Sequence, residues 1–216
     1  MESWLADTRT SYDTVASSYL EQLRGALANL PYLRAMLPLF AELVPDDGPV
    51  ADVGCGPGLV TADLRALGVN AFGIDLSPAM IDIARREHPG VPFAVGSMTD
   101  LPLADASVSG LFAWWSLIHV PDEAVPAVLA HFHRALRPGA PVMIGFHVGD
   151  ETTVKTQGYG GHPMNVHIHR RRPAQVSDLL RAAGFAIESE VVFNPDDRVP
   201  GALVFARRPA VLAPAG

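Results

Sequence analysis

The residues best suited to bind a ligand lie in one short turn, Asp52-Val53-Gly54-Cys55-Gly56-Pro57-Gly58. Its three glycines stand at two-residue steps, so the backbone is free to take positive φ angles and a ligand can approach it without meeting a Cβ. The turn precedes a helical segment, whose first N–H groups favour a negative or carboxylate group. The spacing therefore predicts a site for a nucleotide-like or amino-acid-like ligand.

Two common glycine-rich motifs fit this turn poorly. A dinucleotide fingerprint, G-x-G-x-x-G, requires a glycine where this chain has Leu59, and a P-loop requires a lysine that does not follow. A tight turn that binds nothing stays open as an alternative, because glycine-rich turns also serve the backbone alone.

A second candidate lies in Gly73-Ile74-Asp75-Leu76-Ser77. An acidic residue about 20 residues after a glycine turn is placed to accept hydrogen bonds from a ribose diol. An aspartate before a helix is otherwise an N-cap or a solvated charge, but here Ser77 followed by Pro78 supplies the cap. We therefore expect the carboxylate of Asp75 to be free for a ligand.

Both loops belong to an alternating series of strands and helices. Apolar runs predict strands over 50–53, 69–74, 91–95, 108–115, 142–146, 185–193 and 202–206. Amphipathic segments predict helices over 59–67, 77–89, 122–136 and 173–183. Before residue 48 the chain has the three- and four-residue apolar steps of helices, with a new helix starting at Pro31.

This alternation predicts an α/β protein, an open sheet with right-handed crossovers. The last two strands have no helix between them and should pair antiparallel. We expect a single domain with an N-terminal helical cap over 1–47, a core over 48–208 and a loose tail over 209–216.

Composition narrows the class of protein further. The chain has 216 residues and a net charge of −7, which speaks against a nucleic-acid binder held by phosphate contacts. Its single cysteine cannot form an internal disulfide, and the first residues lack a charged-then-apolar leader, so we expect a cytoplasmic protein. No run approaches the ~18 apolar residues of a membrane span.

Together, Asp52–Gly58 and Gly73–Ser77 resemble motifs I and II of the class I S-adenosylmethionine-dependent methyltransferases. From Tyr12 to about Arg208 the chain resembles the ubiquinone/menaquinone-biosynthesis-type (methyltransferase type 11-like) small-molecule group. The further motifs that carry this resemblance are Tyr12-Asp13 with Ala16 and Tyr19, Leu101-Pro102-Leu103 with Asp105, Leu136-Arg137-Pro138-Gly139-Ala140, and Ala182-Ala183-Gly184-Phe185.

The resemblance implies a three-layer Rossmann-like fold with a mostly parallel seven-stranded sheet and an antiparallel last strand. It also implies S-adenosylmethionine as the cofactor and S-adenosylhomocysteine as its product. The cofactor-binding residues that it implies are Tyr12, Tyr19, Asp52, Gly54, Cys55, Gly56, Asp75, Leu76, Met80, Ser97, Met98 and Trp114.

The resemblance also implies which part of the cofactor each of these residues contacts. The glycine turn would lie against the methionine part with Asp52 beneath it, and Asp75 would take the ribose hydroxyls. The adenine would meet Leu76, Met80, Ser97 and Met98. Tyr12 and Tyr19 would close over the carboxylate, and the backbone around Trp114 would meet the ammonium. The position of Ser97 is often acidic in the group, and a serine accepts a hydrogen bond more weakly.

Methyl transfer is an in-line displacement, so the protein mainly positions the reactants and excludes water. A base is needed only where the nucleophile must lose a proton. His119, after the fourth strand, is our first candidate for that base and His147 the second; a structural role for either stays open. With Trp115 they form the predicted substrate pocket, which a tryptophan face can wall.

Segment 158–172 is rich in glycine and histidine and contains His162, His167 and His169. We expect one strand and a mobile flap at the pocket mouth, with His167 and His169 on one face, and no metal site. We expect Arg170-Arg171-Arg172 to lie on a solvated face. The alternative is that these arginines bind an acidic methyl acceptor.

The resemblance implies a methyltransferase (EC 2.1.1.-) acting on an O, N, C or S atom of a small molecule, and we expect a monomer or homodimer. One alternative is a protein of this fold that binds S-adenosylmethionine and catalyses another reaction, or only binds or regulates. An enzyme acting on RNA or protein is disfavoured by the acidic charge.

Overall fold

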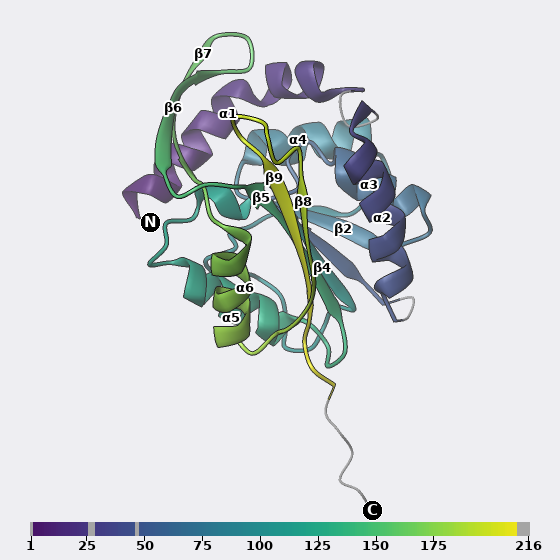
Figure 1. The fold of residues 1–216 in the computed structure, drawn as a ribbon. Coiled ribbons are helices and arrows are strands. Elements are labelled where there is room, and N and C mark those ends of the chain that lie inside the picture. Colours follow the sequence, from purple (N-terminus) through teal and green to yellow (C-terminus); the bar gives the residue numbers. More distant parts are fainter. Residues whose placement is uncertain (1, 26–28, 46–47, 211–216) are drawn as a thin grey trace, which may run out of the picture.

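The computed structural model describes residues 2–25, 29–45 and 48–210. Seven strands form one sheet in the order β3-β2-β1-β4-β5-β9-β8 (Figure 1). Their bounds are β1 (Val50–Val53), β2 (Ala71–Asp75), β3 (Phe93–Val95), β4 (Gly110–Trp114), β5 (Pro141–His147), β8 (Ala186–Phe193) and β9 (Gly201–Arg207). The first five pair in parallel, and β9 is antiparallel to both of its neighbours. The predicted fold class is confirmed.

Helices cover both faces of the sheet because buried strands such as β4 are apolar at successive residues, which point to opposite faces. On β4, Leu111 and Ala113 pack with α5 (Val125–Ala135) and α6 (Pro173–Ala182). Phe112, between them, packs with α2 (Pro31–Leu43) and α3 (Leu59–Ala66) on the other face. The remaining crossover helix, α4 (Pro78–Glu87), packs on β3.

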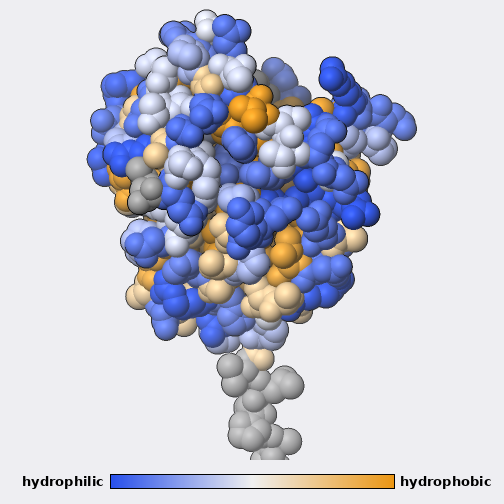
Figure 2. Space-filling model, turned by 90° about the vertical axis from the view of Figure 1, so that its left-hand side faces the viewer, coloured by the Kyte–Doolittle hydropathy of each residue, from blue (hydrophilic) through white to orange (hydrophobic). Residues whose placement is uncertain are grey.

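The first helix, α1 (Ser3–Leu23), crosses the edge of the sheet at which the parallel strands end (Figure 1). A separate antiparallel hairpin, β6 (Thr152–Gly158) and β7 (His162–His169), packs on it. Val15 of α1 is buried against Met164 and Val166 of β7, and the N–H of Asn165 donates to Oγ of Ser11 (2.8 Å). The face that carries the hairpin is mostly hydrophilic (Figure 2).

Some local expectations differ from the structure. The strand expected within 158–172 is present as β7, but it pairs with β6 in an antiparallel hairpin, which was not predicted. The helix expected to start at Asp122 starts at Val125, because Pro121 and Ala124 close a turn through a backbone hydrogen bond (2.9 Å). Residues 46–47 of the expected cap border and 211–216 of the expected tail lie outside the described residues.

Within the described residues, no helix is both long enough and apolar enough to cross a membrane.

Candidate functional site

The glycine-rich turn joins β1 to α3 and is held against β2. The N–H groups of Gly54 and Cys55 donate to the carbonyl of Ile74 (2.7 and 3.1 Å). Gly54 has a φ of 79°, and a Cβ there would lie 2.2 Å from Cβ of Ser116. A Cβ on Gly56 would meet only the Tyr19 ring, at 3.9 Å. Packing therefore requires glycine at position 54, and the backbone at Gly56 stays open to a ligand.

Asp75 ends β2, and its carboxylate is bound to the turn. It accepts hydrogen bonds from the N–H groups of Gly56 and Ser77, both at 2.8 Å. The expectation that it is free is therefore wrong. Ser77 does cap α4, because its Oγ accepts from the N–H of Met80 (3.1 Å), but its own N–H binds the aspartate two residues earlier. Each carboxylate oxygen keeps a second lone pair for a ligand.

Burial raises the pKa of Asp75 to about 6, against the opposing effect of its hydrogen bonds with the N–H groups of Ser77 and Gly56. The carboxylate is therefore ionised at neutral pH and becomes protonated in mildly acidic solution.

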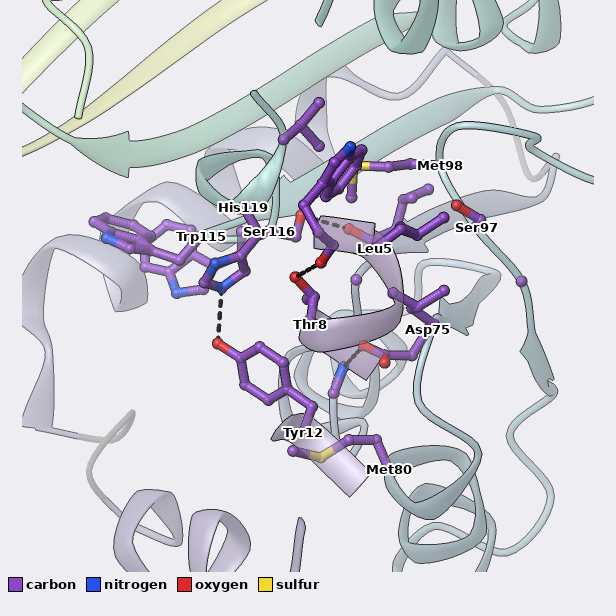
Figure 3. A pocket seen from close by; sticks show the side chains of 18 of the residues that line it. Leu5, Thr8, Tyr12, Asp75, Met80, Ser97, Met98, Trp115, Ser116 and His119 are labelled. Atoms are coloured by element: carbon purple, nitrogen blue, oxygen red, sulfur yellow. Dashed lines mark hydrogen bonds between the residues drawn. The ribbon is translucent and has the colours of Figure 1, made fainter. Parts of the chain in front are cut away.

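A cavity lies between α1 and the ends of β1, β2 and β4 (Figure 3). Ten of the predicted cofactor residues line it: Tyr12, Tyr19, Gly54, Gly56, Asp75, Leu76, Met80, Ser97, Met98 and Trp114. So do Trp4, Leu5 and Thr8 of α1, which sequence reasoning missed. Steps of four residues back from Tyr12 lead to Thr8 and Trp4, so the helical stripe could have revealed these two.

The remaining two predicted cofactor residues, Asp52 and Cys55, line a neighbouring cavity. Asp52 is buried, and its Oδ2 accepts a hydrogen bond from the hydroxyl of Thr61 (2.6 Å). Burial raises its pKa to about 7, against the effect of that hydrogen bond. Burial likewise raises the pKa of the Cys55 thiol, which keeps it protonated and a poor nucleophile.

Ser97, at the rim of the first cavity, is engaged in a short turn. Its Oγ accepts from the N–H of Thr99 (3.1 Å) and hydrogen-bonds with the Thr99 hydroxyl (2.7 Å). The Ser97 hydroxyl thus already accepts a hydrogen bond from the protein backbone.

The structure gives Asp13, the second residue of the Tyr12-Asp13 pair, a role in packing α1 against the start of α4. Its Oδ1 accepts from the hydroxyl of Ser77 (2.6 Å) and from the N–H of Ala79 (3.1 Å), at the start of α4. A carboxylate is favoured at a helix N-terminus. This contact fixes α1 beside the end of β2 and so places Tyr12 over the first cavity.

Tyr12 and His119 form a half-buried pair at the wall of that cavity. The carbonyl of His167 can only accept, so Nδ1 of His119 donates to it (2.9 Å) and carries the ring proton. Nε2 is then the acceptor and receives the hydroxyl of Tyr12 at 2.7 Å (Figure 3). Burial lowers the pKa of His119 to about 4, so the imidazole is neutral at pH 7. The imidazole joins α1 to the hairpin.

We expect the half-buried His119 to make the stability of the fold depend on pH. The unfolded chain binds a proton near the ordinary pKa of ~6.5, whereas the folded chain binds it only near pH 4, so the free energy of unfolding falls as the pH drops through that window. Urea unfolding at about pH 7 and about pH 5 should show that wild type loses about 1–2 kcal/mol more than His119→Gln. The amide keeps a donor and an acceptor but does not titrate. Equal losses in the two proteins would contradict the assignment.

Trp115 and His147 lie together at the second cavity. Trp115 follows β4 with a φ of 49°, an uncommon conformation for a non-glycine residue. Its indole Nε1–H donates to Nδ1 of His147 (3.0 Å). Burial, with Arg170 and Lys155 nearby, lowers the pKa of His147 to about 4. Of the predicted substrate-pocket residues, Trp115 and His147 line the second cavity, whereas His119 lines only the first.

Arg171 was expected on a solvated face, and that prediction is wrong. The side chain is 1% exposed, and its guanidinium donates to Oδ1 of Asp122 and to the carbonyls of Leu117 and Val120. Three acceptors from a segment about fifty residues earlier satisfy the buried charge. Arg171 therefore ties the loop that carries His119 to the base of the hairpin.

His167 and His169 lie on one face of β7, as predicted, with ring centroids 6.0 Å apart. Nδ1 of His169 hydrogen-bonds with the hydroxyl of Thr152 (2.8 Å). Among the residues that the structure describes, no three His, Cys, Asp or Glu side chains come together as metal ligands.

The order and direction of the seven strands are those of the class I methyltransferase fold. Residues 50–139, from β1 to the turn before β5, match the family described as "Methyltransferase domain". The match covers less than half of the chain.

Relatives and solved structures agree with this assignment. The biotin biosynthesis bifunctional protein BioHC of Cellvibrio japonicus is 32% identical over 162 residues, which is 74% of this chain and 30% of that protein. The ubiquinone biosynthesis O-methyltransferase of Xanthomonas axonopodis pv. citri is 29% identical over 72% of this chain and 70% of its own. This chain spans about a third to a half of the first curated relatives that it matches.

Among solved structures, the 1,6-didemethyltoxoflavin-N1-methyltransferase of Burkholderia thailandensis superposes with a TM-score of 0.72. It shares 22% sequence identity, and the match covers 95% of this chain and 89% of that one. The structural match thus extends well beyond the residues that the family match covers.

Proposed function

We propose that this protein transfers the methyl group of S-adenosylmethionine to a small molecule. The observation that carries the proposal is that two cavities meet at one wall. Both are lined by Tyr19, Gly54, Gly56, Trp114 and Trp115. One cavity contains the carboxylate of Asp75, and the other is lined by aromatic rings. A reaction that joins two ligands needs two such chambers with a common wall.

The residues of the first cavity fit the chemistry of S-adenosylmethionine. Asp75 has lone pairs for the ribose hydroxyls, the open backbone at Gly56 suits the methionine part, and Met80 and Met98 offer apolar surface to the adenine. When bound, this cofactor supplies a methyl group on a positively charged sulfonium, from which a neutral thioether departs readily.

The first helix must move to admit the cofactor. With α1 in place the first cavity encloses only about 90 Å³, whereas pockets for ligands of this size measure about 300–1,000 Å³. Trp4, Leu5 and Thr8 of α1 line the confined space. We propose that α1 moves outward for binding and then closes, which excludes water from the reaction.

We assign His119 a positioning role. Its Nε2 receives the hydroxyl of Tyr12, and its Nδ1 is bound to the hairpin backbone. Neither nitrogen is open to a methyl acceptor while these bonds hold. We propose that His119 orients Tyr12 toward the carboxylate end of the cofactor, and that the acceptor lies in the second cavity beside His147.

A label-transfer assay tests the function. The full chain is incubated with S-adenosylmethionine carrying a labelled methyl group and a panel of phenols, carboxylic acids, amines, ring nitrogens and thiols. The expected result is a labelled methyl product with at least one acceptor class. Tight binding of S-adenosylhomocysteine without transfer to any acceptor would overturn the proposal and favour a binding module.

A further inference from the structure

The second cavity is built for a planar ring. It encloses about 570 Å³, within the range of pockets that hold small organic ligands. The rings of Tyr32 and Phe193 are stacked at its wall, with centroids 4.8 Å apart and 20° between their planes. Tyr19 and Tyr159 lie 4.5 Å apart on the wall as well. Aromatic surfaces of this kind favour stacked or edge-on contacts with another ring.

His147 is a polar group in this chamber whose hydrogen-bonding direction is fixed. An indole nitrogen can only donate, so the bond from Trp115 Nε1 fixes Nδ1 of His147 as an acceptor. The ring is neutral at pH 7, because burial and the charges of Arg170 and Lys155 lower its pKa to about 4. Its one proton must therefore be on Nε2. His147 and His119 thus have opposite tautomers.

Nε2–H of His147 is available to a ligand. His147 is half-buried and lines the cavity, and within the described part of the chain its Nε2 has no hydrogen-bond partner. A donor without a protein partner at the wall of a ring-lined chamber calls for an acceptor atom on the ligand.

Trp115 is held firmly enough to set this direction. Its backbone N–H donates to the carbonyl of Gly145 (3.0 Å), and its indole lies over Gly145, where a Cβ would approach the ring to 2.7 Å. The positive φ of Trp115 is a further constraint that the surroundings maintain. The indole and the imidazole therefore form a preorganised pair.

The chamber offers the donor of His147, whereas the groups that could remove a proton are engaged or protonated among the described residues that line it. Asp52, the one carboxyl among the described residues that line it, is buried and bonded to Thr61. Burial raises the pKa values of Cys55, Tyr19 and Tyr159, so all three are protonated at neutral pH. A nucleophile that loses its proton to solvent before it binds needs no base in this chamber.

We propose that the second cavity binds a planar aromatic acceptor as its oxyanion, with Nε2–H of His147 donating to that oxygen. This inference rests on the proposed function. The phenol releases its proton to solvent beforehand. A lone pair of the oxygen then forms the O–C bond as the S–C bond breaks and its electron pair passes to sulfur. An anion and a sulfonium cation thus give a neutral ether and a neutral thioether, with no proton left for the protein to take.

The tautomers can be measured directly. In a long-range ¹H–¹⁵N spectrum of the histidine-labelled protein at neutral pH, His147 should show the Nε2–H form and His119 the Nδ1–H form. Trp115→Phe removes the indole donor and should change the His147 pattern while leaving that of His119. An Nδ1–H form at His147 in the wild-type protein would overturn the proposal.

Binding selectivity is measured without turnover. The protein loaded with S-adenosylhomocysteine is titrated by calorimetry with 4-nitrophenolate and with 4-nitroanisole, a ring of the same shape without the charge. Wild type should prefer the phenolate by about 10-fold or more, because hydrogen bonds to ionised groups are strong. His147→Phe should reduce the preference to about 2-fold, and His147→Gln, whose amide can accept and donate, should restore most of it.

The outcomes separate the two proposals. Equal affinity of the wild type for both rings, or an unchanged preference in His147→Phe, would overturn the role of His147. Retained binding of S-adenosylhomocysteine shows that each variant is folded. Selective phenolate binding without methyl transfer to any acceptor would support the chamber and overturn the methyltransferase function.

Discussion

Replacement of Asp75 by alanine should lower the affinity for S-adenosylhomocysteine about 30- to 1,000-fold. The carboxylate is the group that we assign to the ribose hydroxyls, and charge-assisted hydrogen bonds contribute about 1.5–3 kcal/mol. The change also removes the acceptor of the Gly56 and Ser77 N–H groups, which loosens the turn that we assign to the methionine part. Calorimetric titration of the purified full chain measures the effect.

Two further variants isolate the role of the charge. Asp82→Ala removes a carboxylate on the exposed side of α4 and should leave the affinity unchanged. Asp75→Asn keeps the shape and one acceptor oxygen, so its loss should lie between those of the other two. If Asp75→Ala bound S-adenosylhomocysteine as tightly as the wild type, the assignment of Asp75 to the cofactor site would be wrong.

The pH dependence of binding gives the same assignment a second readout. Because burial raises the pKa of Asp75 to about 6, the carboxylate gains a proton as the pH falls below that value and loses acceptor strength. Wild-type affinity should therefore fall between about pH 7 and about pH 5 more steeply than that of Asp75→Asn. Parallel profiles would show that another group controls binding.

The second large effect is expected at Gly54. Alanine there adopts a positive φ, which costs about 1–2 kcal/mol, and its Cβ overlaps the side chain of Ser116, which adds about 1–3 kcal/mol. Gly54→Ala should therefore lower the free energy of unfolding by about 2–5 kcal/mol in urea denaturation. The displaced turn should also bind S-adenosylhomocysteine more weakly.

Gly68 provides the matched control. It has a similar φ of 88°, and a Cβ there meets no heavy atom within 4 Å. Gly68→Ala should therefore lower the free energy of unfolding only by the cost of the positive φ, about 1–2 kcal/mol. Its affinity for S-adenosylhomocysteine should stay that of the wild type. Ser116→Gly in the Gly54→Ala background removes the overlapping Cβ and should recover part of the loss. Equal destabilisation at positions 54 and 68 would contradict the packing argument.

Local chemistry made much of the site predictable from sequence. The glycine turn and Asp75 follow from backbone requirements within a few residues, and the structure places both at the ends of parallel strands. The strand pattern likewise predicts the sheet, because buried strands such as β4 are apolar on both faces.

Features that depend on distant contacts could not be predicted. The strand β6 is exposed along much of its length, so Thr152–Gly158 lacks an apolar alternation, and its partner is β7 rather than the main sheet. Arg171 is buried only because three acceptors from a much earlier segment converge on it. The positive φ of Trp115, which directs its indole toward His147, has no sequence signal.

All three tryptophans of the chain, Trp4, Trp114 and Trp115, line the first cavity. The entire intrinsic tryptophan fluorescence of this protein therefore originates at the site. Trp114 and Trp115 lie with ring centroids 4.3 Å apart on the wall between the two cavities, and Trp4 is carried by α1. Movement of the helix and filling of either chamber should thus change the emission directly, and a stopped-flow trace can time each step without an added dye.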